Sequence, residues 1–142
     1  MYVKESIEVG SMETISAKEF ECLIVELKRP PSHHLITLIV VYKSPTCSRS
    51  RFKEHIQSLT RFQASDKLII VGDFNYDISQ NQNESFLHFM KTVFPKTECL
   101  DVSLTTHGFT KLDLCFSSFE RASANIITCV WSYHHTLVLS LF

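Results

Sequence analysis

Glycine and proline are scarce in this sequence, with 3 and 4 residues among 142, which excludes collagen-like and low-complexity chains. Charged residues make up 20% and hydrophobic residues 44%, the composition of a packed globular protein rather than a disordered one. A chain of this length is expected to form one domain, residues 1–142, around one continuous core.

An excess of positive charge is also absent. The 14 Lys and Arg residues oppose 15 Asp and Glu residues, for a net charge of -1. Without a global basic field, any contact with nucleic acid must be local. No apolar run approaches the roughly 20 residues that span a bilayer, and the first residues lack the apolar stretch of a secretion signal. We therefore expect no membrane association.

The cysteines and histidines lack the spacing of a zinc site. The five cysteines are scattered, odd in number and without a Cys-x-x-Cys pair. This pattern favours neither a zinc knuckle nor a disulfide framework, and it indicates a reducing, intracellular compartment, nuclear or cytoplasmic. The seven histidines show neither helical i, i+4 spacing nor flanking cysteines.

Hydrophobic periodicity predicts both strands and helices. Two β-branched runs between Glu21 and Tyr42, separated at 28–34 by two prolines, predict a pair of strands. Apolar residues at helical spacing predict one helix behind Ser48 that reaches Phe62, and a second helix that stops near Pro95. Further strands are expected at 67–71, 112–116, 126–131 and 137–141. This order predicts a layered α/β fold with a mixed sheet.

The expected strand at 67–71 leads into the sharpest candidate site. Its continuous apolar run is typical of a strand buried on both faces, and it ends at Gly72-Asp73-Phe74-Asn75. Along a strand, Asp73 and Asn75 point to one side and Phe74 into the core, and ligand crevices of α/β sheets lie at strand ends. Such a pair can orient a water molecule against a phosphate. The alternative is that these residues only form a turn.

Two further segments place polar residues beside apolar strands. The segment Ser132-Tyr133-His134-His135 precedes the last strand, where a histidine either donates to a phosphoryl oxygen or is simply packed or exposed. Asp113 interrupts another apolar strand. Its carboxylate is either paired with a histidine or exposed at a sheet edge.

The order of these pieces resembles a known family. It resembles the order of motifs in the endonuclease/exonuclease/phosphatase superfamily. The motifs here are Tyr42 and Pro45 after a strand, then a helix, Gly-Asp-Phe-Asn, a Thr-x-x-Gly-x-Thr-x-Leu-Asp pattern ending at Asp113, and Ser-x-His. The closest likeness is to the endonuclease domains of LINE-type retrotransposons and related mobile elements. Residues Met1–Lys4 and Phe20–Leu27 resemble two successive family strands, so the resemblance covers nearly the whole chain.

The resemblance implies roles for five residues. Asp73 matches the residue that activates or positions the attacking water, and Asn75 the residue that binds the phosphate and that water. His134 matches the histidine that stabilises the phosphoryl charge, Asp113 the carboxylate that orients it, and Tyr42 a tyrosine lining the phosphate site. The implied reaction is hydrolysis of a phosphodiester in nucleic acid, DNA in the first place, with Mg²⁺ or Mn²⁺ as Lewis acid.

Two departures from the family pattern reduce the expected activity. The family's N-terminal strand with its Asn, and the following Glu that is the main metal ligand, lie upstream of the segment matching Met1. The family's Ser-Asp-His is Ser132-Tyr133-His134 here, which removes a carboxylate. We therefore expect an incomplete metal site, weak Mg²⁺ binding and a weak or inactive phosphodiesterase. The alternatives are a non-catalytic module that binds nucleic acid or protein, and a remnant without selected function.

Overall fold

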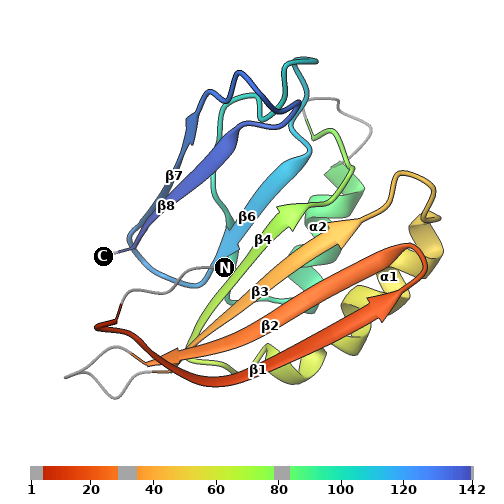
Figure 1. Cartoon of the computed structure of the whole chain (residues 1–142). Helices are drawn as coiled ribbons and strands as arrows, with labels where there is room; N and C mark the ends of the chain where they lie inside the picture. The colour runs from red at the N-terminus through yellow and green to blue at the C-terminus, as the bar shows by residue number, and fades with distance from the viewer. Residues whose placement is uncertain (1–4, 29–34, 79–83, 142) are drawn as a thin grey trace.

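The computed structural model describes residues 5–28, 35–78 and 84–141. Its centre is a six-stranded sheet in the order β1-β2-β3-β4-β6-β5, and β7 pairs with β8 in a separate sheet. Strands β3 and β4 run parallel, and the other neighbours in the large sheet run antiparallel. The elements are β1 (Glu8–Ala17), β2 (Phe20–Lys28), β3 (Leu35–Lys43), α1 (Arg49–Ser58), a 3₁₀ turn (Thr60–Phe62), β4 (Lys67–Asp73), α2 (Glu84–Val93), β5 (Glu98–Cys99), β6 (Asp113–Ser117), β7 (Ala122–Ile127) and β8 (Thr136–Leu141) (Figure 1).

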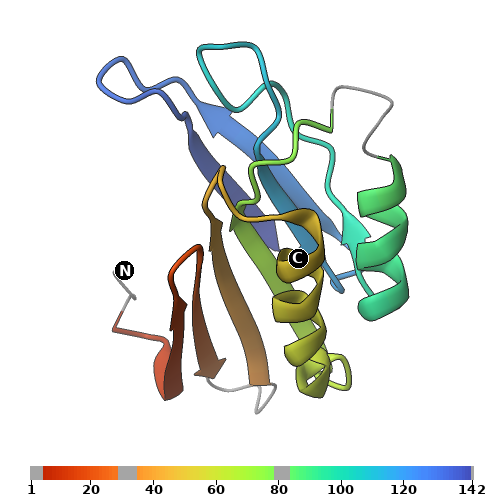
Figure 2. The same ribbon diagram turned by 90° about the vertical axis from the view of Figure 1, so that its right-hand side faces the viewer.

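The two helices cover one face of the large sheet, and the β7–β8 hairpin lies on the opposite side (Figures 1 and 2). An aromatic core fills the space between helices and sheet: Phe52 of α1 and Phe86 of α2 both pack their rings against Phe74, which follows β4. This is the mixed α/β arrangement that the sequence predicts. Among the described residues, neither helix is long and apolar enough to cross a membrane.

Strand β4 is internal, as its apolar run predicts. It pairs parallel with β3 and antiparallel with β6. Leu68, Ile69 and Ile70 are all buried, although successive side chains on a strand point to opposite faces. Both faces of β4 are therefore covered, and its C-terminal end is held between two neighbouring strands.

Several element boundaries differ from the prediction. Ser48 caps α1, as expected, by accepting a hydrogen bond from the Arg51 N–H at 3.3 Å, but the helix ends at Ser58 and Phe62 belongs to the separate 3₁₀ turn. Strand β1 was not predicted, because most of its side chains are exposed and polar and give no apolar periodicity. The segments Met1–Lys4 and 29–34 lie outside the described residues.

The predicted strand over Ile126–Trp131 was wrong in its second half. Strand β7 ends at Ile127, whose partner Thr136 is the first residue of β8. Because this hairpin is only two strands wide, residues beyond Ile127 have no partner strand in the described structure. Val130 and Trp131 consequently lie in an exposed loop, 71% and 91% accessible to solvent.

Gly72 permits the close approach of β3 and β4 just before Asp73. Its φ of +151° is essentially restricted to glycine, and a Cβ would lie 1.8 Å from the Val41 carbonyl oxygen. We expect Gly72→Ala to lower the free energy of unfolding by about 3 kcal/mol or more, measured by urea denaturation.

Gly10→Ala is the matched control, because a Cβ at Gly10 would lie 3.6 Å from its nearest neighbour, the Glu26 carbonyl oxygen. This control is expected to change the free energy of unfolding by less than ~1 kcal/mol. Equal effects of the two substitutions would contradict the account of Gly72.

Candidate active site

Three neighbouring strands present a row of polar side chains at their ends. The register aligns Tyr42 of β3 with Asp73 of β4, and Asp73 with Asp113 of β6. Directly paired residues point to the same face of a sheet. The next residues along β3 and β6 towards the core, Val41 and Leu114, belong to the cluster under the helices. The tyrosine and the two carboxylates therefore occupy the face away from the helices.

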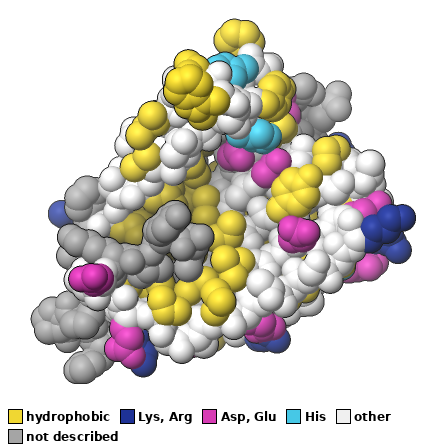
Figure 3. All heavy atoms as spheres, in the orientation of Figure 1, with side chains coloured by type: hydrophobic (Ala, Val, Ile, Leu, Met, Phe, Trp, Pro, Cys, Tyr) yellow, Lys and Arg dark blue, Asp and Glu magenta, His cyan; other side chains and the backbone are white. Residues whose placement is uncertain are grey.

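His134 reaches this row from the loop before β8. An isolated bridge between Thr106 and His134 fixes its backbone. Its Nδ1 lies 2.8 Å from Oδ2 of Asp113, and its Nε2 lies 3.7 Å from Oδ2 of Asp73. An ionised carboxylate can only accept, so Nδ1 donates to Asp113 and Nε2 faces Asp73. On the face shown in Figure 3, acidic side chains and a histidine lie side by side in the upper part.

The structure thus brings together Asp73, Asp113 and His134, three of the predicted site residues. Their side chains are 17%, 16% and 34% exposed. Asp113 adopts the paired arrangement and not the exposed-edge alternative. The carboxylates of Asp73 and Asp113 lie directly opposite each other and repel. The His134 imidazole lies beside both, because it donates to Asp113 and turns its other nitrogen towards Asp73.

The local environment shifts the ionisation of Asp73. Burial raises its pKa above the ordinary value of 3.8, and the neighbouring charge of Asp113 raises it further. The Asn75 N–H opposes this by donating to Oδ1 of Asp73 at 2.9 Å, and His134 also lowers the pKa. Burial is the largest of these contributions, so the ionised form of Asp73 is disfavoured in the folded protein.

This raised pKa predicts that Asp73→Asn stabilises the fold at neutral pH. The native state binds more protons than the unfolded chain between the ordinary pKa of 3.8 and the raised one, so wild-type stability falls as the pH rises through that window. We expect a higher Tm for the variant at neutral pH, by thermal unfolding followed by circular dichroism, and no gain well below pH 3.8. Asp101→Asn, at a side chain 96% exposed, is the control. A variant less stable than wild type at neutral pH would contradict this prediction.

Asn75 and Tyr42 adjoin the three central residues. Strand β4 ends at Asp73, and Asn75 has a left-handed backbone with φ of 48°; the strand alternation that predicted its direction therefore does not extend to it. Its Nδ2 donates to the Lys43 carbonyl at 2.7 Å, which ties the end of β4 to the end of β3. Tyr42 is 45% exposed and lines a groove of about 460 Å³ over β1, β2 and β3.

Tyr133 lies beside His134, at the position where the family resemblance predicts an aspartate. It is 55% exposed, and its ring meets the His134 ring edge-on, with 5.5 Å between centroids. A phenol is a poorer oxygen ligand for a hard cation than a carboxylate. Tyr133 therefore contributes an aromatic surface to the site rather than a negative charge.

Sequence reasoning missed two residues that position the site. The buried Thr105 hydroxyl accepts hydrogen bonds from the Leu112 and Asp113 N–H groups, both at 3.1 Å, and so fixes the start of β6. Lys43 is 4% exposed at the end of β3, and burial lowers the pKa of its amine, an effect that Cys47 and Asp73 oppose. The sequence did contain a signal for Lys43. It is a charged residue two positions after Val41 and four after Ile39, so strand alternation places it on the same buried face as these two residues.

The donor set fits a divalent cation held by few ligands. Asp73, Asp113 and His134 each offer one ligand atom, and these atoms lie within 4.8 Å of one another. His134 Nδ1 and Asp113 Oδ2 are bonded to each other, which leaves Nε2 of His134, Oδ2 of Asp73 and the second oxygen of Asp113 to face a cation. Mg²⁺ is bound by oxygen ligands in octahedral geometry and commonly keeps several waters. The residues therefore suit a hydrated, loosely bound ion.

Comparison with known proteins identifies the fold. No family model matches the chain, and no curated protein matches it in sequence. The sulfate-bound catalytic domain of human Nocturnin matches with a TM-score of 0.72 at 15% identity, over 99% of this chain and 62% of that one. An endonuclease/exonuclease/phosphatase protein from Bacteroides vulgatus matches with a TM-score of 0.69 at 14% identity, over 99% and 69%. The endonuclease domain of TRAS1, a telomere-specific non-LTR retrotransposon, matches with a TM-score of 0.65 at 16% identity, over 92% and 67%.

The chain therefore has the endonuclease/exonuclease/phosphatase fold, as the sequence resemblance predicted. It spans 62% to 69% of the length of the three structures named above. Proteins with this fold include a mannosyl-6-phosphatase from Bacteroides thetaiotaomicron as well as the retrotransposon endonuclease. Fold alone thus leaves the substrate open between nucleic acids and small phosphate esters.

Proposed function

We propose that the chain is part of a single metal-dependent phosphodiesterase domain of the endonuclease type found in mobile elements, and that its activity is weak. The observation that carries this proposal is the placement of His134 between Asp113 and Asp73, with one ring nitrogen towards each carboxylate. These residues come from β4, β6 and the loop before β8. A histidine held by one carboxylate and facing another at strand ends is suited to acid–base work on a phosphate ester.

Asp73, Asp113 and His134 each have a defined task in this proposal. Asp73, with Oδ1 held by the Asn75 N–H, keeps Oδ2 directed towards a water molecule or cation. Asp113 positions the imidazole of His134 so that Nε2 faces the same space. When protonated, Nε2 donates to a phosphoryl oxygen and stabilises its charge. Asp73 and Asp113 would hold a divalent cation, which when bound would supply Lewis-acid stabilisation of the phosphate.

Two observations favour nucleic acid, and DNA in particular, as the substrate. The sequence motifs resemble those of retrotransposon endonucleases, and the TRAS1 endonuclease domain shares the fold. The described cysteines are all free, which fits the reducing nucleus or cytoplasm. With a net charge of -1, recognition depends on local contacts near the site.

Weak activity follows from the small number of oxygen ligands. With Tyr133 in place of a carboxylate, Asp73 and Asp113 are the carboxylates of the described cluster. We expect Mg²⁺ to bind with a dissociation constant in the millimolar range, measured by isothermal titration calorimetry. Asp73→Asn should weaken this binding further, whereas the surface control Asp101→Asn should not. Micromolar or tighter binding of Mg²⁺ would contradict the prediction.

Nicking of supercoiled plasmid with Mg²⁺ or Mn²⁺ tests the proposed reaction. We expect slow conversion to open circles that stops when EDTA is added. The alternative is a non-catalytic binding module, which the exposed Tyr133 beside His134 favours. Fluorescence anisotropy with a labelled oligonucleotide separates the two, because binding without metal-dependent nicking would assign the chain to the second class.

A further inference from the structure

Exposed aromatic side chains surround the loops that hold His134. Trp131 is 91% exposed, Phe109 78% and Tyr133 55%. Single exposed apolar residues are common on protein surfaces, but these three lie on two loops that are bonded to each other. The His107 N–H donates to the Tyr133 carbonyl at 3.0 Å, beside the Thr106–His134 bridge.

Tyr133 connects the active site to the loop that carries Phe109. One side of its ring meets the His134 ring. Its hydroxyl lies over Gly108, where a Cβ would be only 2.2 Å from the phenolic oxygen. Gly108 thus leaves room for Tyr133, and Phe109 follows directly in the chain.

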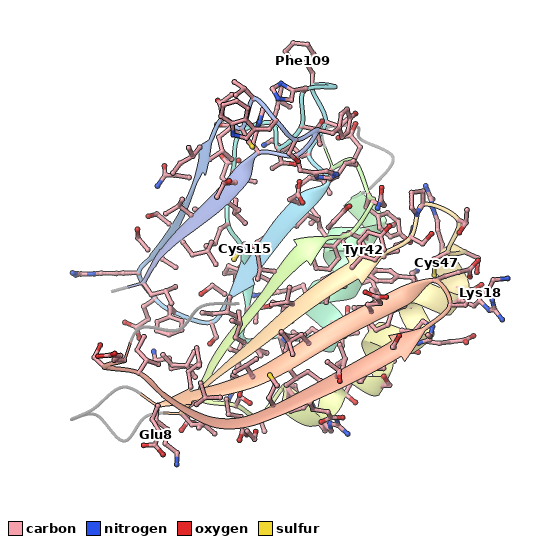
Figure 4. All side chains as sticks on the ribbon, in the orientation of Figure 1. Glu8, Lys18, Tyr42, Cys47, Phe109 and Cys115 are labelled. Carbon is pink, nitrogen blue, oxygen red and sulfur yellow. The ribbon has the colours of Figure 1, made fainter. Side chains whose placement is uncertain are left out.

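Phe109 is held outward by an unfavourable backbone conformation. Its φ of 58° lies in the left-handed region, which bulky residues rarely adopt. The conformation is fixed by the Phe109 N–H, which donates to the Thr106 carbonyl at 3.2 Å, and by a 2.7 Å hydrogen bond between the Thr106 and Thr110 hydroxyls. Figure 4 shows the Phe109 ring projecting from the tip of the molecule. Strain of this kind is typical of functional loops.

We propose that Trp131, Tyr133 and Phe109 form a stacking rim for an unpaired nucleobase next to the phosphodiester bound at Asp73 and His134. The inference rests on the proposed function and narrows its substrate to nucleic acid with an unpaired base. Every base has a planar face that stacks on aromatic rings without sequence preference. The Tyr133 ring of this rim adjoins His134 itself, so a base flanking the reacting phosphate meets Tyr133 first.

The charge of these loops supports stacking as the main attraction. Residues 105–110 and 128–136 contain no Lys or Arg, and the adjacent Lys111 pairs with Asp101 at 3.2 Å. These two loops therefore offer no Lys or Arg of their own to the phosphate backbone. A large protein partner is disfavoured, because protein interfaces centre on aromatic residues enclosed by other apolar contacts, whereas polar Ser132 separates Trp131 from Tyr133 and polar Thr110 follows Phe109.

The chain offers a direct probe, because Trp131 is its only tryptophan. We expect oligothymidylate, added in EDTA so that no cleavage occurs, to quench the intrinsic fluorescence. An abasic oligonucleotide with the same number of phosphates should leave it unchanged. By anisotropy with labelled oligothymidylate, Trp131→Ala should weaken binding about tenfold, whereas Trp131→Phe and the neighbouring control Val130→Ala should bind within about threefold of wild type.

Equal quenching by the abasic oligonucleotide, or unchanged affinity of Trp131→Ala, would overturn the stacking rim. Self-association that Trp131→Ala abolishes, seen by sedimentation, would also overturn it and assign the rim to a protein contact. Plasmid nicking measured on the same preparation keeps the two proposals apart. Nicking without base-dependent quenching refutes only the rim, and base-dependent quenching without nicking supports the rim while refuting the hydrolytic function.

Discussion

The Asp73→Ala variant is expected to nick supercoiled DNA about a thousandfold more slowly than wild type, which places it at background. Oδ2 of Asp73 lies 3.7 Å from His134 Nε2, on the side of the imidazole that faces away from Asp113, whereas Asp113 holds the imidazole through its Oδ2. In the proposed reaction, removing the Asp73 carboxylate takes away both the group that orients the attacking water and a ligand for the cation. The initial rate of open-circle formation, with Mg²⁺ or Mn²⁺ and with EDTA, measures the effect.

The control and the pH dependence sharpen this prediction. Asp101→Ala removes a carboxylate that is 96% exposed and should retain the wild-type rate. Because the proposed reaction uses the ionised form of Asp73 and burial raises the pKa of this group, the wild-type rate should fall as the pH drops towards that raised pKa. Retention of nicking by Asp73→Ala, or a rate that increases steadily on acidification, would remove Asp73 from the reaction.

His134→Ala should lower the nicking rate by about a thousandfold, and Asp113→Ala by about ten- to a hundredfold. The difference follows from geometry, since Nε2 of His134 faces the reacting space while Asp113 acts through the opposite nitrogen at 2.8 Å. His88→Ala, at an exposed position on α2, is the control and should retain the wild-type rate.

A double variant separates positioning from general loss of structure. If Asp113 acts through the imidazole, combining Asp113→Ala with His134→Ala should be no slower than His134→Ala alone, because residues that act as a unit are non-additive. Multiplication of the two effects would show that Asp113 acts independently. Far-ultraviolet circular dichroism of each variant checks that the fold is retained.

The sequence was sufficient to predict the strands that carry the site. The apolar run 67–71 identified β4 as internal, and its abrupt end identified Asp73 as a strand-end carboxylate. The alignment of Tyr42, Asp73 and Asp113 in one row was not readable from periodicity, because strand register depends on pairing between distant segments. The close approach of β3 at Gly72 likewise requires the structure, since it is a contact between backbones.

Loops account for most of what the sequence did not predict. Val130 and Trp131 extend the apolar run of β7 in the sequence, yet both side chains are exposed. A sequence pattern does not distinguish apolar residues that pack inward from apolar residues on the surface. Asn75 departs from strand alternation through a positive φ, which depends on its hydrogen bonds to Asp73 and Lys43. The roles of Asn75 and Tyr42 in binding a phosphate remain predictions from the family resemblance.

The central claim, a phosphodiesterase site at Asp73, Asp113 and His134, is tested most directly by one comparison. The rate of metal-dependent plasmid nicking is measured for wild type and for a double variant carrying Asp73→Ala and His134→Ala. The account predicts slow nicking by wild type that EDTA abolishes, and a double variant at background that is no slower than either single variant. Nicking by the double variant at the wild-type rate, or no nicking by wild type above the EDTA background, would contradict the assignment of Asp73, Asp113 and His134 as a phosphodiesterase site.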